Sequence, residues 1–244
     1  MKFPTPLIPG RLERRYKRFL CDVMVEGKLL TAHCANPGSM LGLCEAGEEV
    51  FLSRSDNPKR KLSFSLELVR AGPSGGGTLV GVNTILANRL VEEALKAGEI
   101  PQLAGYDKIR REVPYGKNSR IDFLLEGAEK PPCYVEVKSV TLSRQKGLAE
   151  FPDSVTARGA KHLAELAERA REGARAVMLF LIQRGDCVRF DLARDIDPAY
   201  EAAFLKAGAE GVESLCYKCA LSLEGIKLDR EVECGEELMI KGVA

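Results

Sequence analysis

Residues 120–140 read RIDFLLEGAEKPPCYVEVKSV, and this stretch decides the fold of the second part of the chain. Both halves have the apolar and β-branched composition of strands, with turn-forming sequence around Pro131 and Pro132 between them. Because side chains alternate between the two faces of a strand, Glu136 and Lys138 share one face. Asp122 joins them if the two strands pair. The stretch therefore predicts two carboxylates and one ammonium group at a single point of a buried sheet.

Two interpretations of this charged cluster follow from the residues alone. Carboxylates in such a setting hold Mg²⁺ or Mn²⁺, and a metal ion beside a lysine is suited to attack on a phosphodiester. The alternative is a cross-strand ion pair with a purely structural role, which is common for acidic and basic residues two apart on a strand. The spacing leaves both interpretations open.

The N-terminal third predicts a small all-β domain. Short runs with alternating apolar residues are separated by turn signals such as Asn36-Pro37-Gly38. Five such strands in about 65 residues favour a five-stranded barrel of the OB type. The predicted strands are Phe19–Val25, Leu29–Cys34, Val50–Ser53, Leu62–Leu68 and Thr78–Val82.

After residue 82 the pattern changes to alternating helices and strands. Asn83 can cap a helix that runs to Ala97, and Leu86, Leu90, Glu93 and Ala97 are expected on one face of it. The order of the remaining elements predicts an α/β domain with a mixed central sheet covered on both faces. We therefore expect two domains, residues 1–82 and 83–244. The further predicted elements are strands at 109–113, 120–125, 133–140, 176–182, 187–192 and 212–221 and helices at 153–172 and 198–207.

The composition indicates the partner and the cellular compartment more clearly than the activity. The 244 residues carry a net charge of only +1, but the first eighty residues have an excess of Lys and Arg, which suits an anionic partner. There is no apolar run long enough to cross a membrane and no signal peptide, so a cytoplasmic protein is expected. The eight cysteines are accordingly expected to be reduced thiols. Cys216 and Cys219 lack the second pair that a zinc site needs.

The succession of a helix, a strand with Asp122, a strand with Glu136-Val137-Lys138 and a second helix resembles the PD-(D/E)XK nuclease core. A wider set of motifs resembles the sugar fermentation stimulation protein (SfsA) family. These motifs are RYKRFL at 15–20, HCANPGSM at 33–40, NPKRK at 57–61, VNT at 82–84, SRIDF at 119–123, YVEVKSVTL at 134–142, and FPDSVT at 151–156 followed by Arg158-Gly159 and Lys161-His162-Leu163.

The resemblance implies an OB barrel followed by a PD-(D/E)XK-like domain, binding to DNA without sequence preference, and a role in regulating maltose metabolism. It also implies that Asp122 and Glu136 are ligands of Mg²⁺ or Mn²⁺ and that Lys138 is the catalytic lysine. Glu93 would be the additional catalytic acid that some of these nucleases contribute from their first helix.

Basic residues in three places are candidates for contact with nucleic acid, with DNA as the first partner and RNA as the second. They are Arg14, Arg15, Lys17 and Arg18 before the first predicted strand, Lys59, Arg60 and Lys61 after an Asn-Pro turn, and Arg158 and Lys161 on the helix that follows the nuclease motif. Three functions remain open at this point: a Mg²⁺-dependent nuclease, a non-catalytic DNA-binding regulator with a nuclease-like fold, and a metabolic regulator that acts through protein contacts.

Overall fold

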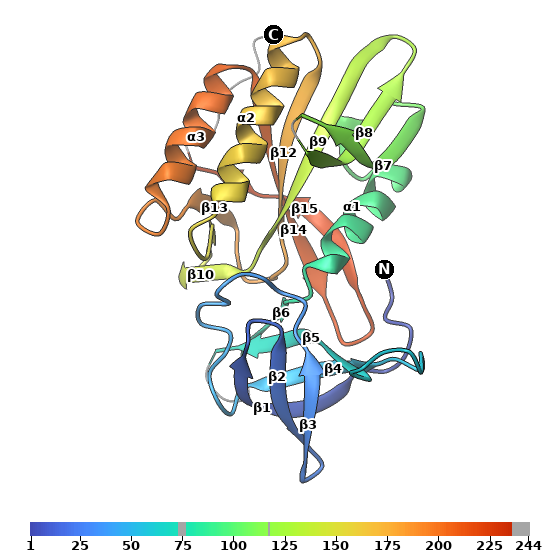
Figure 1. Ribbon diagram of the computed structural model, residues 1–244, viewed down its shortest axis with the longest axis vertical. Helices are drawn as coiled ribbons and strands as arrows, with labels where there is room; N and C mark the ends of the chain where they lie inside the picture. The colour runs from blue at the N-terminus through green and yellow to red at the C-terminus, as the bar shows by residue number, and fades with distance from the viewer. Residues whose placement is uncertain (73–76, 117, 236–244) are drawn as a thin grey trace.

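The first five strands close into a barrel, which confirms the OB-type domain predicted from the alternation of apolar residues (Figure 1). The computed structural model describes residues 1–72, 77–116 and 118–235. The strands pair in the order β3-β2-β1-β4-β5-β6, and a further pairing of His33 on β3 with Ser65 on β5 closes the barrel. The strands are β1 (Ile8–Tyr16), β2 (Leu20–Val25), β3 (Lys28–His33), β4 (Glu49–Arg54), β5 (Phe64–Ala71) and β6 (Thr78–Gly81).

Strand β1 was not among the predicted strands, although it completes the barrel. The sequence pattern predicts β2 to β6, and β6 only extends the sheet beside β5. In β1 the single buried side chain is Leu12, surrounded by charged residues such as Glu13, Arg14 and Arg15. With one apolar residue facing the core, the alternation that marks a strand is hidden.

The second domain is a mixed six-stranded sheet between two layers of helices, as predicted (Figure 1). Its strand order is β15-β14-β12-β9-β8-β7, with β12 parallel to β9 and β14 and with β8 antiparallel to β9. Helix α1 packs into the apolar cluster on one face, and α2 and α3 pack into the cluster on the other. The elements are α1 (Ile85–Ala97), a 3₁₀ turn η1 (Pro101–Leu103), β7 (Lys108–Tyr115), β8 (Ser119–Gly127), β9 (Lys130–Val140), α2 (Ala157–Arg171), β12 (Arg175–Ile182), α3 (Pro198–Ala209), β14 (Val212–Leu221) and β15 (Ile226–Glu231).

A smaller sheet, which the sequence predicted only in part, flanks this domain. Its strands pair in the order β10-β11-β13-β16. They are β10 (Leu142–Gln145), β11 (Leu148–Phe151), β13 (Arg189–Leu192) and β16 (Glu233–Cys234), of which only β13 falls in a predicted strand. Within the described residues, no helix is both long and apolar enough to pass through a membrane.

The expectation that all eight cysteines are thiols is wrong for one pair, because Cys216 forms a disulfide with Cys234. Strand β16 pairs with β13 and so returns the chain to the α2 and α3 face of the sheet, where Cys216 lies. Cys219, three residues along β14, belongs to the cluster on the opposite face. The two cysteines of the Cys-x-x-Cys pair therefore point away from each other, as the strand period predicts.

The two domains are joined by specific polar contacts around Asp153. Its Oδ2 accepts a hydrogen bond from the backbone N–H of Met40 at 2.9 Å, and its carbonyl oxygen accepts one from the Ser39 hydroxyl at 2.5 Å. On the other side, the N–H of Gly81 donates to the carbonyl of Gln183 at 2.8 Å. These contacts fix the orientation of the barrel on the second domain.

Gly38→Ala is expected to weaken this junction, because a Cβ at Gly38 would lie 2.4 Å from Oδ2 of Asp153. We expect the free energy of unfolding to fall by about 1–3 kcal/mol. Gly185→Ala is the matched control, since the nearest atom to its Cβ is 4.0 Å away. Denaturant titration of Gly38→Ala, Asp153→Ala and the double variant should give a double-variant cost below the sum of the single costs. Additive costs would show that the carboxylate does not limit the space at Gly38.

Candidate active site

Asp122 lies where strands β8 and β9 separate. Their pairing ends at Phe123 and Val135, one residue short of Asp122. Oδ2 of Asp122 accepts a hydrogen bond from the backbone N–H of Val137 at 2.8 Å, and Oδ1 accepts one from the side-chain amide of Asn88 on α1 at 2.6 Å. The carboxylate thus replaces the missing ladder bond and is held at the opening between the strands.

Glu136 and Lys138 share a face of β9, as the strand period predicts, and α2 adds His162 to them. Oε1 of Glu136 accepts a hydrogen bond from Nζ of Lys138 at 2.7 Å and is also hydrogen-bonded to Nδ1 of His162. Nε2 of His162 accepts from Nε of Arg158 at 3.3 Å. This pattern assigns the ring proton to Nδ1, so that His162 donates to Glu136. Oε2 of Glu136 is buried and has no hydrogen-bond partner among the described residues.

The two carboxylates differ in their ionisation. Burial and the charge of Glu136 raise the pKa of Asp122 to about 6. Burial also favours the neutral form of Glu136, but the hydrogen bond from His162 and the charge of Lys138 outweigh it and hold its pKa below the usual range. Near neutral pH the site therefore contains two close carboxylates, which a bound cation would stabilise.

Tyr115 and Glu165 complete the surroundings of the site. The Tyr115 hydroxyl is buried, and burial together with the charges of Glu136 and Glu165 raises its pKa above the usual range. A Cβ at Gly116, where φ is +56°, would lie 2.7 Å from the carboxyl carbon of Glu165. A glycine is thus required here both by the backbone and by the approach of that carboxylate.

Sequence reasoning did not assign a role to Asn88, Tyr115 or Glu165, and it expected His162 to face a phosphate rather than to contact Glu136. One signal was available for two of them. His162 and Glu165 alternate with Leu163 and Leu166 on the buried side of α2. Polar residues at the inward positions of an amphipathic helix indicate a buried polar cluster.

Glu93 is not brought to this cluster. Its carboxylate pairs with the ammonium group of Met1 at 2.7 Å and with Arg89 at 3.2 Å. The prediction that it lies on the apolar face of α1 is wrong, because the buried stripe consists of Ala87, Leu90, Val91 and Ala94. The helix residue that contacts Asp122 is Asn88, one turn earlier.

The pairing of Glu93 also shows that the first residues lie against the second domain rather than within the barrel. The ammonium group of Met1 donates to the carbonyl of Ile226 at 2.6 Å, and the N–H of Phe3 donates to the carbonyl of Glu224 at 2.9 Å.

The donor set fits Mg²⁺ or Mn²⁺ better than a zinc-type ion. In residues 1–72, 77–116 and 118–235, no three His, Cys, Asp or Glu side chains gather as a metal site. Asp122 and Glu136 would therefore be the only carboxylate ligands. Mg²⁺ needs few protein ligands because it retains several waters, and the buried Oε2 of Glu136 offers it a free oxygen. A structural zinc site would require four protein ligands.

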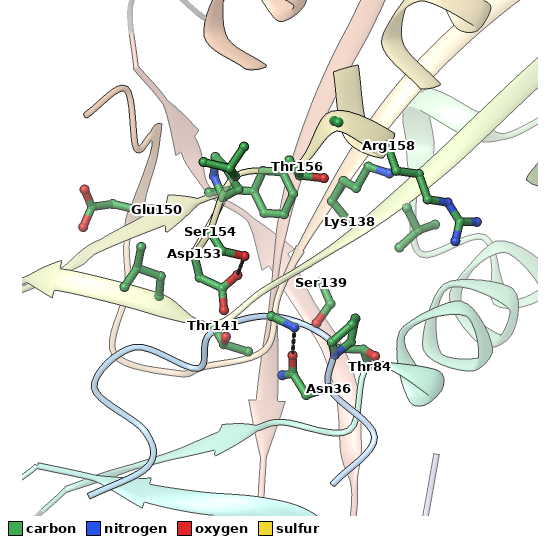
Figure 2. Close-up of a pocket in the computed structure, with 18 of the residues that line it drawn as sticks. Asn36, Thr84, Lys138, Ser139, Thr141, Glu150, Asp153, Ser154, Thr156 and Arg158 are labelled. Atoms are coloured by element: carbon green, nitrogen blue, oxygen red, sulfur yellow. Dashed lines mark hydrogen bonds between the residues drawn. The ribbon is translucent and has the colours of Figure 1, made fainter. Parts of the chain in front are cut away.

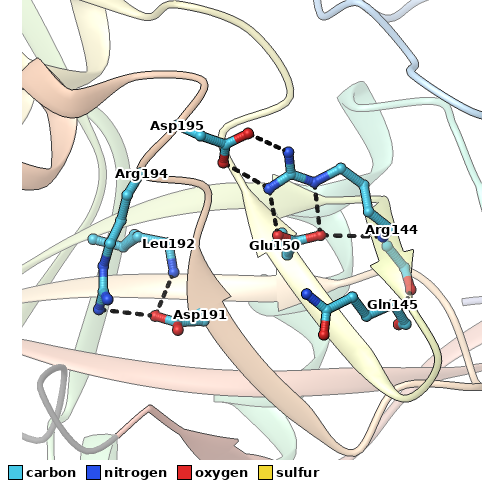
Figure 3. Close-up of polar contacts among 8 residues, drawn as sticks. Arg144, Gln145, Glu150, Asp191, Leu192, Arg194 and Asp195 are labelled. Carbon is cyan, nitrogen blue, oxygen red and sulfur yellow. Dashed lines mark hydrogen bonds and ion pairs between the residues drawn. The ribbon is translucent and has the colours of Figure 1, made fainter.

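A cleft of about 480 Å³ opens beside the cluster, between the barrel and the second domain (Figure 2). Lys138 and Arg158 contribute to it from the second domain, and Asn36 and Thr84 lie across from them. Glu150 also lines the cleft, but Arg144 binds both of its oxygens, at 2.6 and 3.0 Å, and extends to Asp195 (Figure 3). Glu150 and Asp195 thus share the single guanidinium group of Arg144.

Most of the predicted nucleic-acid residues are exposed to solvent, and several of them also have partners within the fold. Arg15 donates to the carbonyls of Asn36, Gly38 and Ser39 and so holds the loop beside the cleft. Within the fold, Arg14 pairs with Asp22, Arg60 donates to Ser65, and Lys161 lies 3.6 Å from Glu165. Arg14, Arg60 and Lys161 are nevertheless exposed, as are Lys17, Arg18, Lys59, Lys61 and Arg158, of which Arg18 and Arg158 line the cleft.

Comparison with known proteins agrees with this architecture. Residues 14–82 match the family model described as the SfsA N-terminal OB domain, and residues 85–225 match the one described as the sugar fermentation stimulation protein RE domain. Sugar fermentation stimulation protein homologs of Ruegeria sp. and Rhodospirillum centenum are 58% and 59% identical to this chain, covering 93% and 94% of it and 97% of each homolog.

Among solved structures, SfsA of Pyrococcus furiosus, described as a complex with Ca²⁺, is similar with a TM-score of 0.86 and 26% identity over 96% of this chain and 98% of its own. The two matched domains, the near-complete coverage and the high identity lead to one conclusion. This chain belongs to the sugar fermentation stimulation protein family.

Proposed function

We propose that this protein binds nucleic acid and hydrolyses phosphodiester bonds with a divalent cation held by Asp122 and Glu136. The observation that carries the proposal is the pair of carboxylates: the half-buried Asp122 has a pKa of about 6, and the buried Glu136 has an unpartnered oxygen. Buried charges are costly, and a site that lacks a compensating ligand is a functional candidate. The similar protein described in complex with Ca²⁺ supports a hard divalent cation in this fold.

Each protein group in the cluster has a distinct task in this proposal. A bound Mg²⁺ or Mn²⁺ would polarise the phosphate and acidify a water molecule. Asn88 and the N–H of Val137 hold Asp122 in place, and His162 holds Oε1 of Glu136 so that Oε2 remains available. The Lys138 ammonium lines the cleft and would neutralise the charge that develops on the phosphate.

One observation favours the non-catalytic alternative. Lys138 and His162 both bind Glu136, so an internal ion pair already accounts for part of the buried charge. In that case the protein would bind nucleic acid without cutting it. Under either function, we propose that the effect on sugar fermentation named in its relatives acts through nucleic-acid binding.

A cleavage assay with Lys138→Met distinguishes these functions. Labelled single-stranded DNA, duplex DNA and RNA would be incubated with Mg²⁺, Mn²⁺ or EDTA. We expect cleavage that requires metal, and a loss of about 100-fold or more in Lys138→Met because one stabilising donor is removed. Lys130→Met is the matched control, since Lys130 is an exposed lysine on the same strand.

Intact substrates in every metal, together with salt-sensitive retention of the probe, would establish the non-catalytic alternative.

A further inference from the structure

The cleft between the domains has walls from both of them. Arg18, from the turn between β1 and β2, lies on the barrel side, and Lys138 and Arg158 lie on the side of the second domain. Asn36, Thr84, Ser139 and Thr156 also line the cleft (Figure 2). The cleft thus leads from the surface of the barrel to the Lys138 ammonium.

Three cations, Arg18, Lys138 and Arg158, and two acids, Glu150 and Asp153, line this cleft. The Arg18 side chain forms no hydrogen bond or ion pair in the part of the chain that the structure describes, and only Nε of Arg158 is engaged, with His162. Of the two acids in the walls, Glu150 is bound by Arg144, which Asp195 also binds, and Asp153 accepts a hydrogen bond from the N–H of Met40. Two guanidinium groups on opposite walls are therefore available to an anionic ligand.

The size of the cleft limits what this ligand can be. Its volume of about 480 Å³ lies within the range of small-molecule sites, about 300–1,000 Å³. The contacts of Asp153 with Ser39 and Met40, and of Gly81 with Gln183, hold the walls together. A few nucleotides of a single strand suit this space, whereas one turn of duplex extends about 34 Å.

Among the described residues that line it, the cleft offers no free platform for stacking bases. Its aromatic lining residue is Phe151, whose ring packs against Phe180 and Tyr200 at centroid distances of 5.7 and 5.2 Å. The amide of Asn36 and the hydroxyls of Thr84, Ser139 and Thr156 are hydrogen-bonded within the protein. The groups that remain for a ligand are therefore mainly the guanidinium groups, which contact phosphates rather than identify bases.

We propose that the cleft is the binding track of a single polynucleotide strand, with phosphates held between Arg18 and Arg158 on the path to Lys138. The proposal rests on the proposed function and adds the strandedness of the substrate to it. It predicts recognition of the backbone without base preference. It also separates Arg18, which would contact the strand, from Arg15, which holds the adjacent loop.

The test measures binding rather than cleavage, so its result does not depend on whether the protein is a nuclease. In EDTA, fluorescence anisotropy would compare a labelled thymidine strand of about 16 nucleotides, the upper site size of one OB fold, with a blunt duplex of equal length. We expect the strand to bind about tenfold more tightly, and a uridine strand to bind within about threefold of the thymidine strand, because the contacts are to phosphates.

The variants Arg18→Ala and Arg158→Ala should each weaken binding of the strand by about fivefold and lower the salt dependence of log K by about 0.7. Lys28→Ala, at the tip of the β2–β3 hairpin far from the second domain, is the control for general charge (Figure 1). Equal binding of duplex and strand, or an equal effect of Lys28→Ala and Arg18→Ala, would overturn the proposal even if the protein cleaves nucleic acid. Specific binding of the strand would support it even if no cleavage is found.

Discussion

Asp122→Asn is expected to raise the stability of the metal-free protein at about pH 8 while abolishing metal uptake and cleavage. The pKa of Asp122 is raised from 3.8 to about 6, so the folded state disfavours the charged carboxylate. Such a shift corresponds to roughly 2 kcal/mol for this partly exposed side chain, or a melting temperature about 4–8 °C higher in the variant. Asparagine is similar in size and can still accept the hydrogen bond from Val137.

The pH dependence of this gain follows from the direction of the shift. Between about pH 4 and pH 6 the folded state holds a proton on Asp122 that the unfolded state has lost, so stability falls as pH rises. The difference in melting temperature between variant and wild type should therefore be small near pH 4, grow up to about pH 6 and then remain constant. Mn²⁺ should reverse the order at high pH, because it binds only the wild type.

Differential scanning calorimetry over this pH range would measure both effects. Asp107→Asn, an exposed carboxylate just before β7, serves as the control and should show no such dependence. A variant that is less stable than wild type at high pH in EDTA would contradict the idea that Asp122 is held under electrostatic strain.

Glu136→Gln is expected to lower the stability of the metal-free protein, whereas Asp122→Asn raises it. Like Asp122→Asn, it is expected to abolish metal uptake. The substitution removes the carboxylate that contacts the Lys138 ammonium, whose side chain is only 13% exposed, and leaves only the more distant charge of Asp122. Breaking a buried ion pair from one side costs about 3–5 kcal/mol, which corresponds to a melting temperature roughly 6–20 °C lower. The neutral amide would also bind a divalent cation more weakly than the carboxylate.

The control for this variant is Glu92→Gln on α1. Glu92 pairs with Lys96 and Arg111 near the surface, and such pairs contribute at most about 1 kcal/mol. Both substitutions would be measured by denaturant titration. Equal destabilisation would show that the ion pair of Glu136 stabilises the protein no more than a surface pair does.

Much of the fold was predictable because it depends on local periodicity. The alternation in residues 120–140 places Glu136 and Lys138 on one face, and the apolar run from Ala176 to Ile182 marks the buried central strand β12. Strand β1 was missed because its single core residue, Leu12, is set among charges that face solvent. Periodicity indicates a strand only when several of its residues reach the core.

The site was less predictable because its geometry depends on contacts between distant segments. Asp122 is held by the separation of β8 from β9, and His162 reaches Glu136 only through the packing of α2. The prediction for Glu93 was wrong because it assigned the inward face of α1 incorrectly. The inward face contains Ala87 and Ala94. The disulfide between Cys216 and Cys234 could not be predicted for the same reason, because it forms only when β16 pairs with β13.

The most direct test of the metal site is a calorimetric titration of Mn²⁺ into wild type, Asp122→Asn and Glu136→Gln at about pH 8, where both carboxylates are ionised. We expect saturable uptake by the wild-type protein and none by either variant that remains folded. Uptake that is unchanged in a folded Asp122→Asn or Glu136→Gln variant would contradict the assignment of these two carboxylates as the metal ligands.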